Sequence, residues 1–294
     1  MSRKKNRQSS LISYKRFVPE QLHKELERCI RYLETLPYSR MTCCTRCGST
    51  RITRKGMADN GIMHYYCFAC KRHFSPVTDL PIINSERHDL WPELLELMFY
   101  GSEKQQSAKI LGICAISVSI KEKILEQVMA EDFSNIYQYW MQYKFALEDY
   151  IPPKVESQIR LTRNWLTETF EPSRSVCPNC FGTHCTQNQA VQKTTARRCR
   201  DCGLRFSVLR GTPFVKSYYT LADFLAYFDT LLTGASNYDV REQLGMADTT
   251  AQRWRKVFYR QLKTFHYYDL YEWIVRRRIG HELYVNYVKR GLLD

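Results

Sequence analysis

The chain has 294 residues, of which 44% are apolar and 13% aromatic, so it can fold as two domains and is not disordered overall. Its 44 Lys and Arg outnumber 30 Asp and Glu, and the net charge of +14 favours polyanionic partners. The sequence contains no apolar run of the kind that crosses a membrane or forms a signal peptide. We therefore expect a cytoplasmic, nucleoid-associated protein whose twelve cysteines stay reduced and bind metal.

The chain begins with a basic segment. Six of residues 1–16 are Lys or Arg and none is acidic, so we expect residues 1–17 to form a basic N-terminal arm. Apolar residues then recur at helical spacing from Leu22 to Leu36, and a similar stripe runs from Val155 to Phe170. Both stretches predict amphipathic helices, to which we assign a packing role.

Eight cysteines form four Cys-x-x-Cys pairs. The pairs come in two sets: Cys44, Cys47, Cys67 and Cys70; and Cys177, Cys180, Cys199 and Cys202. Two such turns joined by a loop of the length of 48–66 or 181–198 match a tetrahedral zinc ribbon, whereas a redox dithiol needs only one motif. We expect two zinc ions per chain, one in each ribbon, 44–70 and 177–202, with the metal supplying much of the folding free energy of a small sheet.

We assign no ligand role to the remaining cysteines. Cys43 abuts Cys44 and competes with it as a ligand, but the second set has Val176 at this position, which selects Cys44. Cys29 and Cys114 lie among apolar residues and are expected to be buried. Cys185 has no counterpart in the first set.

The two halves of the chain match at a nearly constant offset. The offset relates Cys44 to Cys177 and Cys67 to Cys199, and it extends beyond the cysteines: Phe74 corresponds to Phe206, Pro81 to Pro213, Gly101 to Gly234 and Gly112 to Gly245. This repeat indicates that one module is duplicated in tandem. We expect module 1 at 18–133, a linker at 134–150, module 2 at 151–263 and a tail at 264–294. The predicted fold class is mostly α with small β zinc ribbons, in two copies of helix, zinc ribbon and helix-turn-helix.

A pair of short helices around a glycine turn follows each ribbon. In the second copy, 236–260 has the helix-turn-helix layout, with Asp248 expected to cap the second helix. An ordinary pair of packed helices is the alternative for each copy, and the first copy is the weaker candidate. The residues expected to contact DNA are Thr249, Thr250, Gln252, Arg253 and Lys256 on that helix, Ser117, Ser119 and Lys121 in the first copy, and Arg197, Arg198 and Arg205 in the second ribbon.

The tail from 264 to 294 is aromatic and basic. It contains Trp273 and the run Arg276-Arg277-Arg278. Packing on the second module, contact with phosphates and dimerisation are all compatible with this composition.

The order of these motifs resembles the N-terminal DNA-binding regions of bacterial insertion-sequence transposases and their short regulatory proteins. The resemblance rests on the second cysteine set, on Phe206-Ser207 after its last cysteine and on Thr212-Pro213-Phe214, with Phe74-Ser75 in the first copy. It implies sequence-directed DNA binding. A transposase would also need a catalytic domain that holds carboxylates on a metal pair, and the sequence offers no such grouping of acids.

We therefore expect a protein that is not an enzyme and that binds double-stranded DNA sequence-specifically, as a bacterial or mobile-element transcriptional regulator. One alternative is a non-catalytic transposition component, either a DNA-targeting subunit or a truncated transposase relative. A further alternative is an RNA-binding or protein-interaction adaptor. Besides DNA, the expected partners are a second copy of the chain or a separate transposase or transcription machinery, and no membrane.

Overall fold

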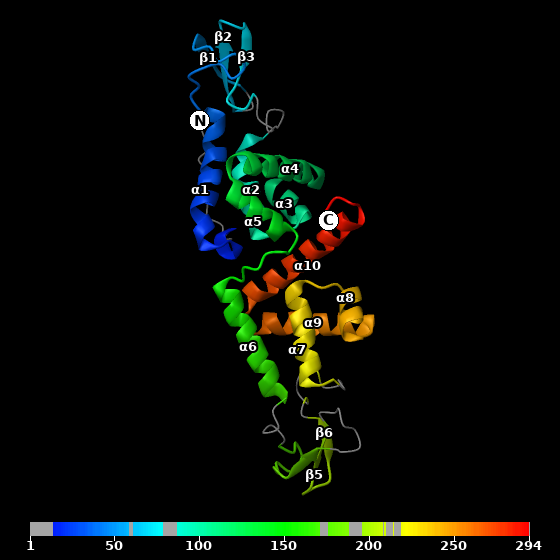
Figure 1. The fold of residues 1–294 in the computed structure, drawn as a ribbon. Helices are drawn as coiled ribbons and strands as arrows, with labels where there is room; N and C mark the ends of the chain where they lie inside the picture. The colour runs from blue at the N-terminus through cyan, green and yellow to red at the C-terminus, as the bar shows by residue number, and fades with distance from the viewer. Residues whose placement is uncertain are drawn as a thin grey trace. The chain divides into compact units, whose positions relative to one another are not determined.

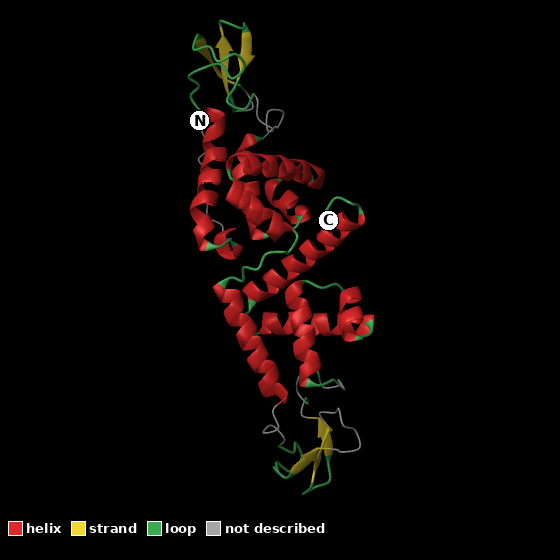
Figure 2. Cartoon of the chain, viewed as in Figure 1, coloured by secondary structure: helices red, strands yellow, loops and turns green. Residues whose placement is uncertain are grey.

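The computed structural model describes residues 14–58, 61–78, 87–170, 176–187, 196–207, 209, 214 and 219–293 (Figures 1 and 2). The chain divides into two compact units, unit 1 from Met1 to Lys144 and unit 2 from Phe145 to Asp294. Each unit combines helices with one small three-stranded antiparallel sheet, and helices dominate, as the sequence predicts. Most of the expected basic arm, and the turns at Pro81 and Pro213, lie outside the described residues.

Unit 1 has a long helix, then the sheet, then four further helices. Its elements are η1 (Tyr14–Phe17), α1 (Glu20–Thr35), η2 (Leu36–Tyr38), β1 (Ile52–Met57), β2 (Met63–Cys67), β3 (Arg72–Phe74), η3 (His88–Leu90), α2 (Trp91–Tyr100), α3 (Lys104–Leu111), α4 (Ala115–Asp132) and α5 (Ser134–Lys144). The apolar stripe of α1 is buried against α2 and α5, as its periodicity predicts. Burial raises the pKa of the Cys29 thiol on this stripe to about 12.

The expected linker 134–150 is helical over its first part. Those residues form α5, which packs against α1 and α4. Its Tyr139 hydroxyl donates to the carbonyl of Phe17, and its Tyr143 hydroxyl donates to the carbonyl of Phe99 at 2.9 Å. Helix α5 is therefore part of the core of unit 1, because its aromatic side chains reach back to segments far apart in that unit's sequence.

Unit 2 has a similar order of elements. They are α6 (Pro153–Phe170), β4 (Cys185–Gln187), β5 (Ala196–Cys199), β6 (Arg205–Ser207), α7 (Leu221–Thr233), α8 (Asn237–Leu244), α9 (Asp248–Thr264) and α10 (Tyr268–Lys289). Aromatic rings form its core. The ring of Trp254 on α9 stacks on Phe224 of α7 with centroids 4.0 Å apart, and the Tyr227 hydroxyl donates to the carbonyl of Ala251 at 2.6 Å.

The C-terminal tail forms α10 and packs on α6, α7 and α9, the first of the three roles considered for it. Two of its arginines hold the segment that precedes α6. Arg276 pairs with the buried Glu148, and Arg277 donates to the carbonyls of Ala146 and Glu148, each at 2.9 Å. Gly234, which ends α7 at φ 81°, lies against this helix, where a Cβ atom would come within 2.5 Å of the Arg277 carbonyl oxygen. Arg276 and Arg277 are thus committed to the core of unit 2.

Candidate metal centres and nucleic-acid interface

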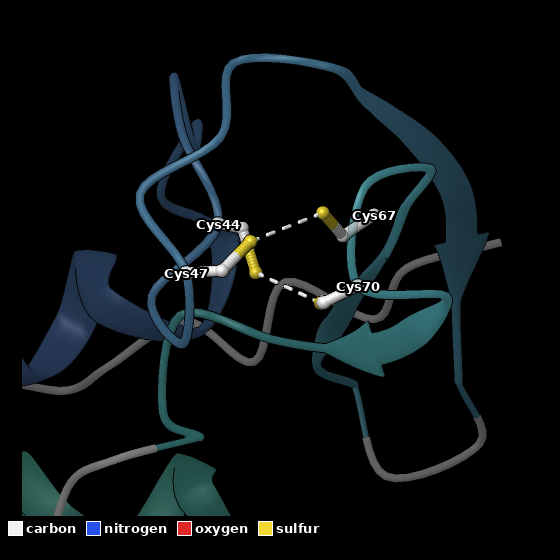
Figure 3. Close-up of side chains that lie close together, drawn as sticks. All are labelled: Cys44, Cys47, Cys67 and Cys70. Carbon is white, nitrogen blue, oxygen red and sulfur yellow. Dashed lines mark hydrogen bonds between the residues drawn. The ribbon is translucent and has the colours of Figure 1, made fainter.

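The first cysteine set meets at one end of the first sheet. Cys44 and Cys47 lie in the turn before β1, Cys67 ends β2, and Cys70 lies in the turn before β3. The Sγ atoms of Cys44 and Cys70 are 3.8 Å apart, and those of Cys47 and Cys67 are 3.6 Å apart (Figure 3). All four sulfurs lie within 4.8 Å of one another and point toward a common centre.

The second set repeats this geometry in unit 2. The Sγ atoms of Cys177 and Cys202 are 3.5 Å apart, as are those of Cys180 and Cys199. A tetrahedral ion with metal–sulfur bonds of about 2.3 Å requires sulfurs about 3.8 Å apart, close to the separations observed in both sets. Four thiolates in this geometry suit zinc or iron. Each set could hold one metal ion, so the structure brings the eight cysteines selected from the sequence together as two candidate metal centres.

The backbone at each Cys-x-x-Cys turn prepares the site for thiolates. The residue after each second cysteine, Gly48, Lys71, Phe181 or Gly203, has positive φ, between 53° and 75°. The N–H of the residue that follows then hydrogen-bonds the second cysteine, as that of Leu204 does for Cys202, while N–H groups inside the turn hydrogen-bond the first. The N–H groups of Cys70 and Ala69 lower the pKa of Cys67 to about 6, and that of Leu204 does the same for Cys202. Burial raises the pKa of Cys70 in the first set to about 12, so the thiols of one set do not ionise alike.

A small apolar core lies behind the first centre. It contains Cys44, Cys67, Met63, Tyr65 and Phe74. The rings of Tyr65 and Phe74 lie on adjacent strands with centroids 5.5 Å apart. This core is small for an independent sheet, so a bound metal would contribute much of its stability.

The other cysteines divide between surface and core. Cys43 and Cys185 are half-buried and belong to neither set, as expected. The expected burial of Cys114 is wrong. Its side chain is exposed at the N-terminus of α4, where the sulfur accepts the N–H of Ser117 at 3.4 Å. A cysteine in a capping position meets solvent because the helix begins at the surface.

The two short helices predicted in the second copy are α8 and α9, joined by residues 245–247. Gly245 ends α8 in the left-handed conformation, at φ 62°. Ala247, and not Asp248, is the N-cap of α9, and no side chain caps that end. Asp248 occupies the first helical position instead, where its negative charge still favours the helix dipole.

Helix α9 separates its buried and exposed faces cleanly. Ala251, Trp254 and Phe258 are buried and form the inner face. The five residues expected to contact DNA lie on the outer face: Thr249, Gln252, Arg253 and Lys256 are exposed and Thr250 is half-buried. Arg260, one turn beyond Lys256, is also exposed and extends this face. The set predicted from the sequence lacks Arg260, although its spacing of four from Lys256 indicates the same face.

Helix α4, which aligns with α9 in the first half of the chain, has fewer exposed polar and basic residues at the predicted DNA-contact positions. Ser117 and Ser119 of α4 are half-buried, and Lys121 is buried, with its Nζ 4.7 Å from the centroid of the Trp91 ring. A buried ammonium held over an aromatic face is unsuited to phosphate contact, so the role assigned to Lys121 is corrected. The unit 1 helix therefore presents a weaker basic surface than α9.

The second sheet presents arginines. Arg198 and Arg205 lie directly opposite each other on β5 and β6, and both are exposed. Arg197 points to the other face and is half-buried. Arg200, in the turn after β5, is exposed too and is absent from the sequence-based set. Like charges paired across strands are unfavourable unless an anion lies between them, which marks this face as a candidate phosphate contact.

Comparison of the chain with known proteins gave no match. No protein-family model matches the chain, and no curated protein or solved structure is similar to it. Within the described residues, no helix has a stretch apolar and long enough to cross a bilayer.

Proposed function

We propose that this chain is a non-enzymatic zinc protein of the cytoplasm that binds double-stranded DNA, with α9 as the helix that enters the major groove. Its role would be that of a sequence-specific, nucleoid-associated transcriptional regulator. The exposed face of α9 carries the proposal. This face combines Thr249, Gln252, Arg253, Lys256 and Arg260, which offer hydrogen bonds to bases and positive charges to phosphates.

The arrangement of α8 and α9 supports the proposal. Two helices joined by a short glycine turn form the layout of helix-turn-helix proteins, whose second helix enters the groove. The Ser236 hydroxyl accepts the N–H of Asp239, and the Asp239 carboxylate accepts the N–H of Ser236 at 2.7 Å, so a capping box starts α8. Buried Arg255 donates to the carbonyl of Ala235 at 2.8 Å and ties α9 to the segment before α8. These hydrogen bonds connect the start of α8 to α9.

We also propose that the two units are copies of one zinc module. The backbone supports this interpretation independently of the cysteines. Phe68 donates its N–H to the Arg51 carbonyl at 2.9 Å, and Arg200 donates its N–H to the His184 carbonyl at 2.8 Å. The offset that aligns the two sequences pairs Phe68 with Arg200 and Arg51 with His184, so the two bonds are equivalent. Elemental analysis of the purified chain should find two zinc ions, and iron in their place would refute the choice of metal.

The experiment for DNA binding is substitution of Arg253. Duplexes with a randomised core are first selected on the parent protein, and binding of Arg253→Ala is then measured by fluorescence anisotropy at several salt concentrations. Loss of a base contact should cost about 1–3 kcal/mol on selected duplexes and less on random ones. Lys256→Ala should weaken both alike and reduce the salt dependence by about one ion.

Ile120→Ala is the matched control, because Ile120 is the counterpart of Arg253 in the first half and is exposed on α4. It should leave duplex binding unchanged. If Arg253→Ala binds selected and random duplexes as the parent does, α9 is not the reading helix. If no sequence is enriched from the pool, the protein is not a sequence-specific regulator.

A further inference from the structure

The outer face of the first sheet carries aromatic rings, of which Phe68 and His73 are exposed and Tyr66 is half-buried. Strand register places Thr53, Tyr66 and His73 side by side on β1, β2 and β3, on the face opposite the apolar core. Phe68 follows in the turn after β2, and its side chain is 51% exposed. The sheet therefore has one buried aromatic layer, which contains Tyr65 and Phe74, and a second layer that is partly open to solvent.

The rings of the outer layer form a continuous cluster. Tyr66 lies 5.4 Å from Phe68, edge to face, and 5.0 Å from His73, measured between ring centroids. The Nζ atom of Lys55 lies 5.6 Å from the centroid of the Tyr66 ring. Rings set at angles beside a cation leave edges and faces on which a flat, electron-rich ligand can stack.

The surroundings of the cluster are strongly basic. Residues 40–78 contain seven Lys and Arg, and Asp59, outside the described residues, is the only acid. Exposed aromatic side chains in a positive setting match a single-stranded nucleic acid, which supplies unpaired bases and phosphates together. A duplex keeps its bases paired and stacked, so it cannot use the rings in this way.

The second sheet shows that the fold does not require these rings. The counterparts of Tyr66, Phe68 and His73 in the second half are Arg198, Arg200 and Arg205. Arg198 pairs with Thr186 and Arg205 in the register that Tyr66 has with Thr53 and His73. The same three-stranded sheet thus forms with three arginines, and the aromatic side chains of the first sheet need another explanation.

We propose that the outer face of the first sheet binds unpaired nucleic acid, with bases stacked on Tyr66 and Phe68 and Lys55 beside the phosphates. This site is separate from α9 and goes beyond the proposed duplex binding. DNA and RNA single strands share the chemistry it recognises. The rings act by stacking, so the site should accept different base sequences.

The test uses the full chain and fluorescein-labelled oligo(dT), oligo(rU) and a blunt duplex in anisotropy titrations. Phe68→Ala is the main variant, because an exposed side chain can be removed without disturbing the core. We expect it to weaken binding of single strands about tenfold, which corresponds to about 1.4 kcal/mol, and to leave duplex binding unchanged. Tyr66→Phe should bind as the parent does, because it keeps the ring. Unequal losses for oligo(dT) and oligo(rU) would identify the preferred strand.

Phe181→Ala is the matched control, since it removes a ring that is 78% exposed beside a Cys-x-x-Cys turn of the second ribbon. Retention of two metal ions shows that each variant is folded. The proposal is overturned if folded Phe68→Ala binds single strands as the parent does, or loses single-strand and duplex binding equally. An oligo-glutamate peptide supplies negative charge without bases. The proposal is also overturned if this peptide, added at the same concentration of charge as the single strands, competes with them for a site that depends on Phe68. Failure of duplex binding by α9 would instead appear as parent-like behaviour of Arg253→Ala.

Discussion

Helices α4 and α9 align with each other when the two halves of the sequence are matched, yet they expose different chemistry. In the alignment of the two halves, Thr249 and Arg253 on α9 correspond to Ile116 and Ile120 on α4. The two isoleucines are 73% and 55% exposed. Two positions that are polar or basic in unit 2 are therefore aliphatic in unit 1, and the counterparts of Lys256 and Arg260 are Lys123 and Gln127, so the unit 1 face also carries less positive charge. A groove-reading role fits α9 and not α4, and the difference favours unit 2 as the place of the proposed duplex contact.

The buried faces of the same helices are related in another way. Trp254 corresponds to Lys121, and Phe224, on which Trp254 stacks, corresponds to Trp91. Unit 2 thus packs a tryptophan on a phenylalanine where unit 1 packs a lysine on a tryptophan. The place of a side chain against the neighbouring helix is kept, while its chemical type is not. Long aliphatic stems explain how Lys can fill an aromatic position.

The metal ligands should give the largest effect. Cys177→Ser removes one thiolate of the second centre, so metal content should fall from two ions per chain to one. Structural zinc contributes on the order of 10 kcal/mol to the folding of a small domain, and β4, β5 and β6 should lose their amide protection in hydrogen exchange. Cys185→Ser, a change in the same ribbon outside the ligand set, is the control. Loss of both ions would contradict two independent centres.

The second largest effects are expected in the buried cores of the two units, where substitutions should change stability by different amounts. Trp254→Ala should destabilise unit 2 by about 3–5 kcal/mol, since it empties a large buried volume. Lys121→Ala should cost unit 1 only about 1–2 kcal/mol, through lost stem packing and the contact with Trp91. Calorimetry measures both changes, with the exposed Lys256→Ala as a variant that should shift neither transition. Equal costs for the two core variants would contradict the different packing of the units.

The helix caps should produce a smaller, pH-dependent difference. Burial raises the pKa of Asp239, but bonds with Ser236 and the nearby His281 lower it more, so the net pKa lies below the usual value. Ionised Asp239 therefore stabilises the fold above its unfolded pKa of about 3.9, and this contribution disappears as pH falls through the folded value. Asp239→Asn should cost about 1 kcal/mol at pH 7 and nothing in strong acid.

The corresponding helix of unit 1 supplies the control for this cap. Gln106 stands in the place of Asp239, and Glu103, the N-cap of α3, makes no side-chain capping bond. Gln106→Ala should change stability by the same small amount at every pH. Urea unfolding of both variants across the pH range tests the contrast, and a pH-independent loss in Asp239→Asn would contradict the capping assignment.

The smallest effect is expected at the cysteine turns. Phe181 has φ 59° where the first ribbon has Gly48 at φ 69°. Because a glycine adopts this conformation without steric cost, Phe181→Gly should stabilise the second ribbon by about 0.5–1 kcal/mol. Gly48→Ala should destabilise the first ribbon by a similar amount. Metal retention against a competing chelator measures both changes. Phe181→Gly should increase retention in the second ribbon and Gly48→Ala should decrease it in the first, and changes of the same sign would contradict the prediction.

Spacing and periodicity were sufficient for some features. The two cysteine sets follow from short Cys-x-x-Cys turns, and the buried stripe of α1 follows from the helical spacing of Leu26, Ile30 and Leu33. The prediction that Lys121 contacts DNA was wrong, because it relied on residue type alone and a charged side chain usually indicates exposure. The repeat contained the correction, since it aligns Lys121 with the buried Trp254. The prediction that Cys114 is buried was wrong for the opposite reason: its neighbours in sequence are apolar, but it lies at an exposed helix start.

The sequence by itself determined the two thiolate sets, the matching halves and the helical stripes, because each depends on residues close together in the chain or on regular spacing. Tertiary structure alone decided that 134–144 belongs to the core of unit 1, that α10 packs on unit 2, and which basic side chains remain at the surface. These outcomes depend on contacts between distant residues, such as Arg276 with Glu148, 128 positions apart. Local patterns cannot specify such pairs, because the same arginine is equally compatible with solvent, phosphate or a buried carboxylate until its neighbours are in place.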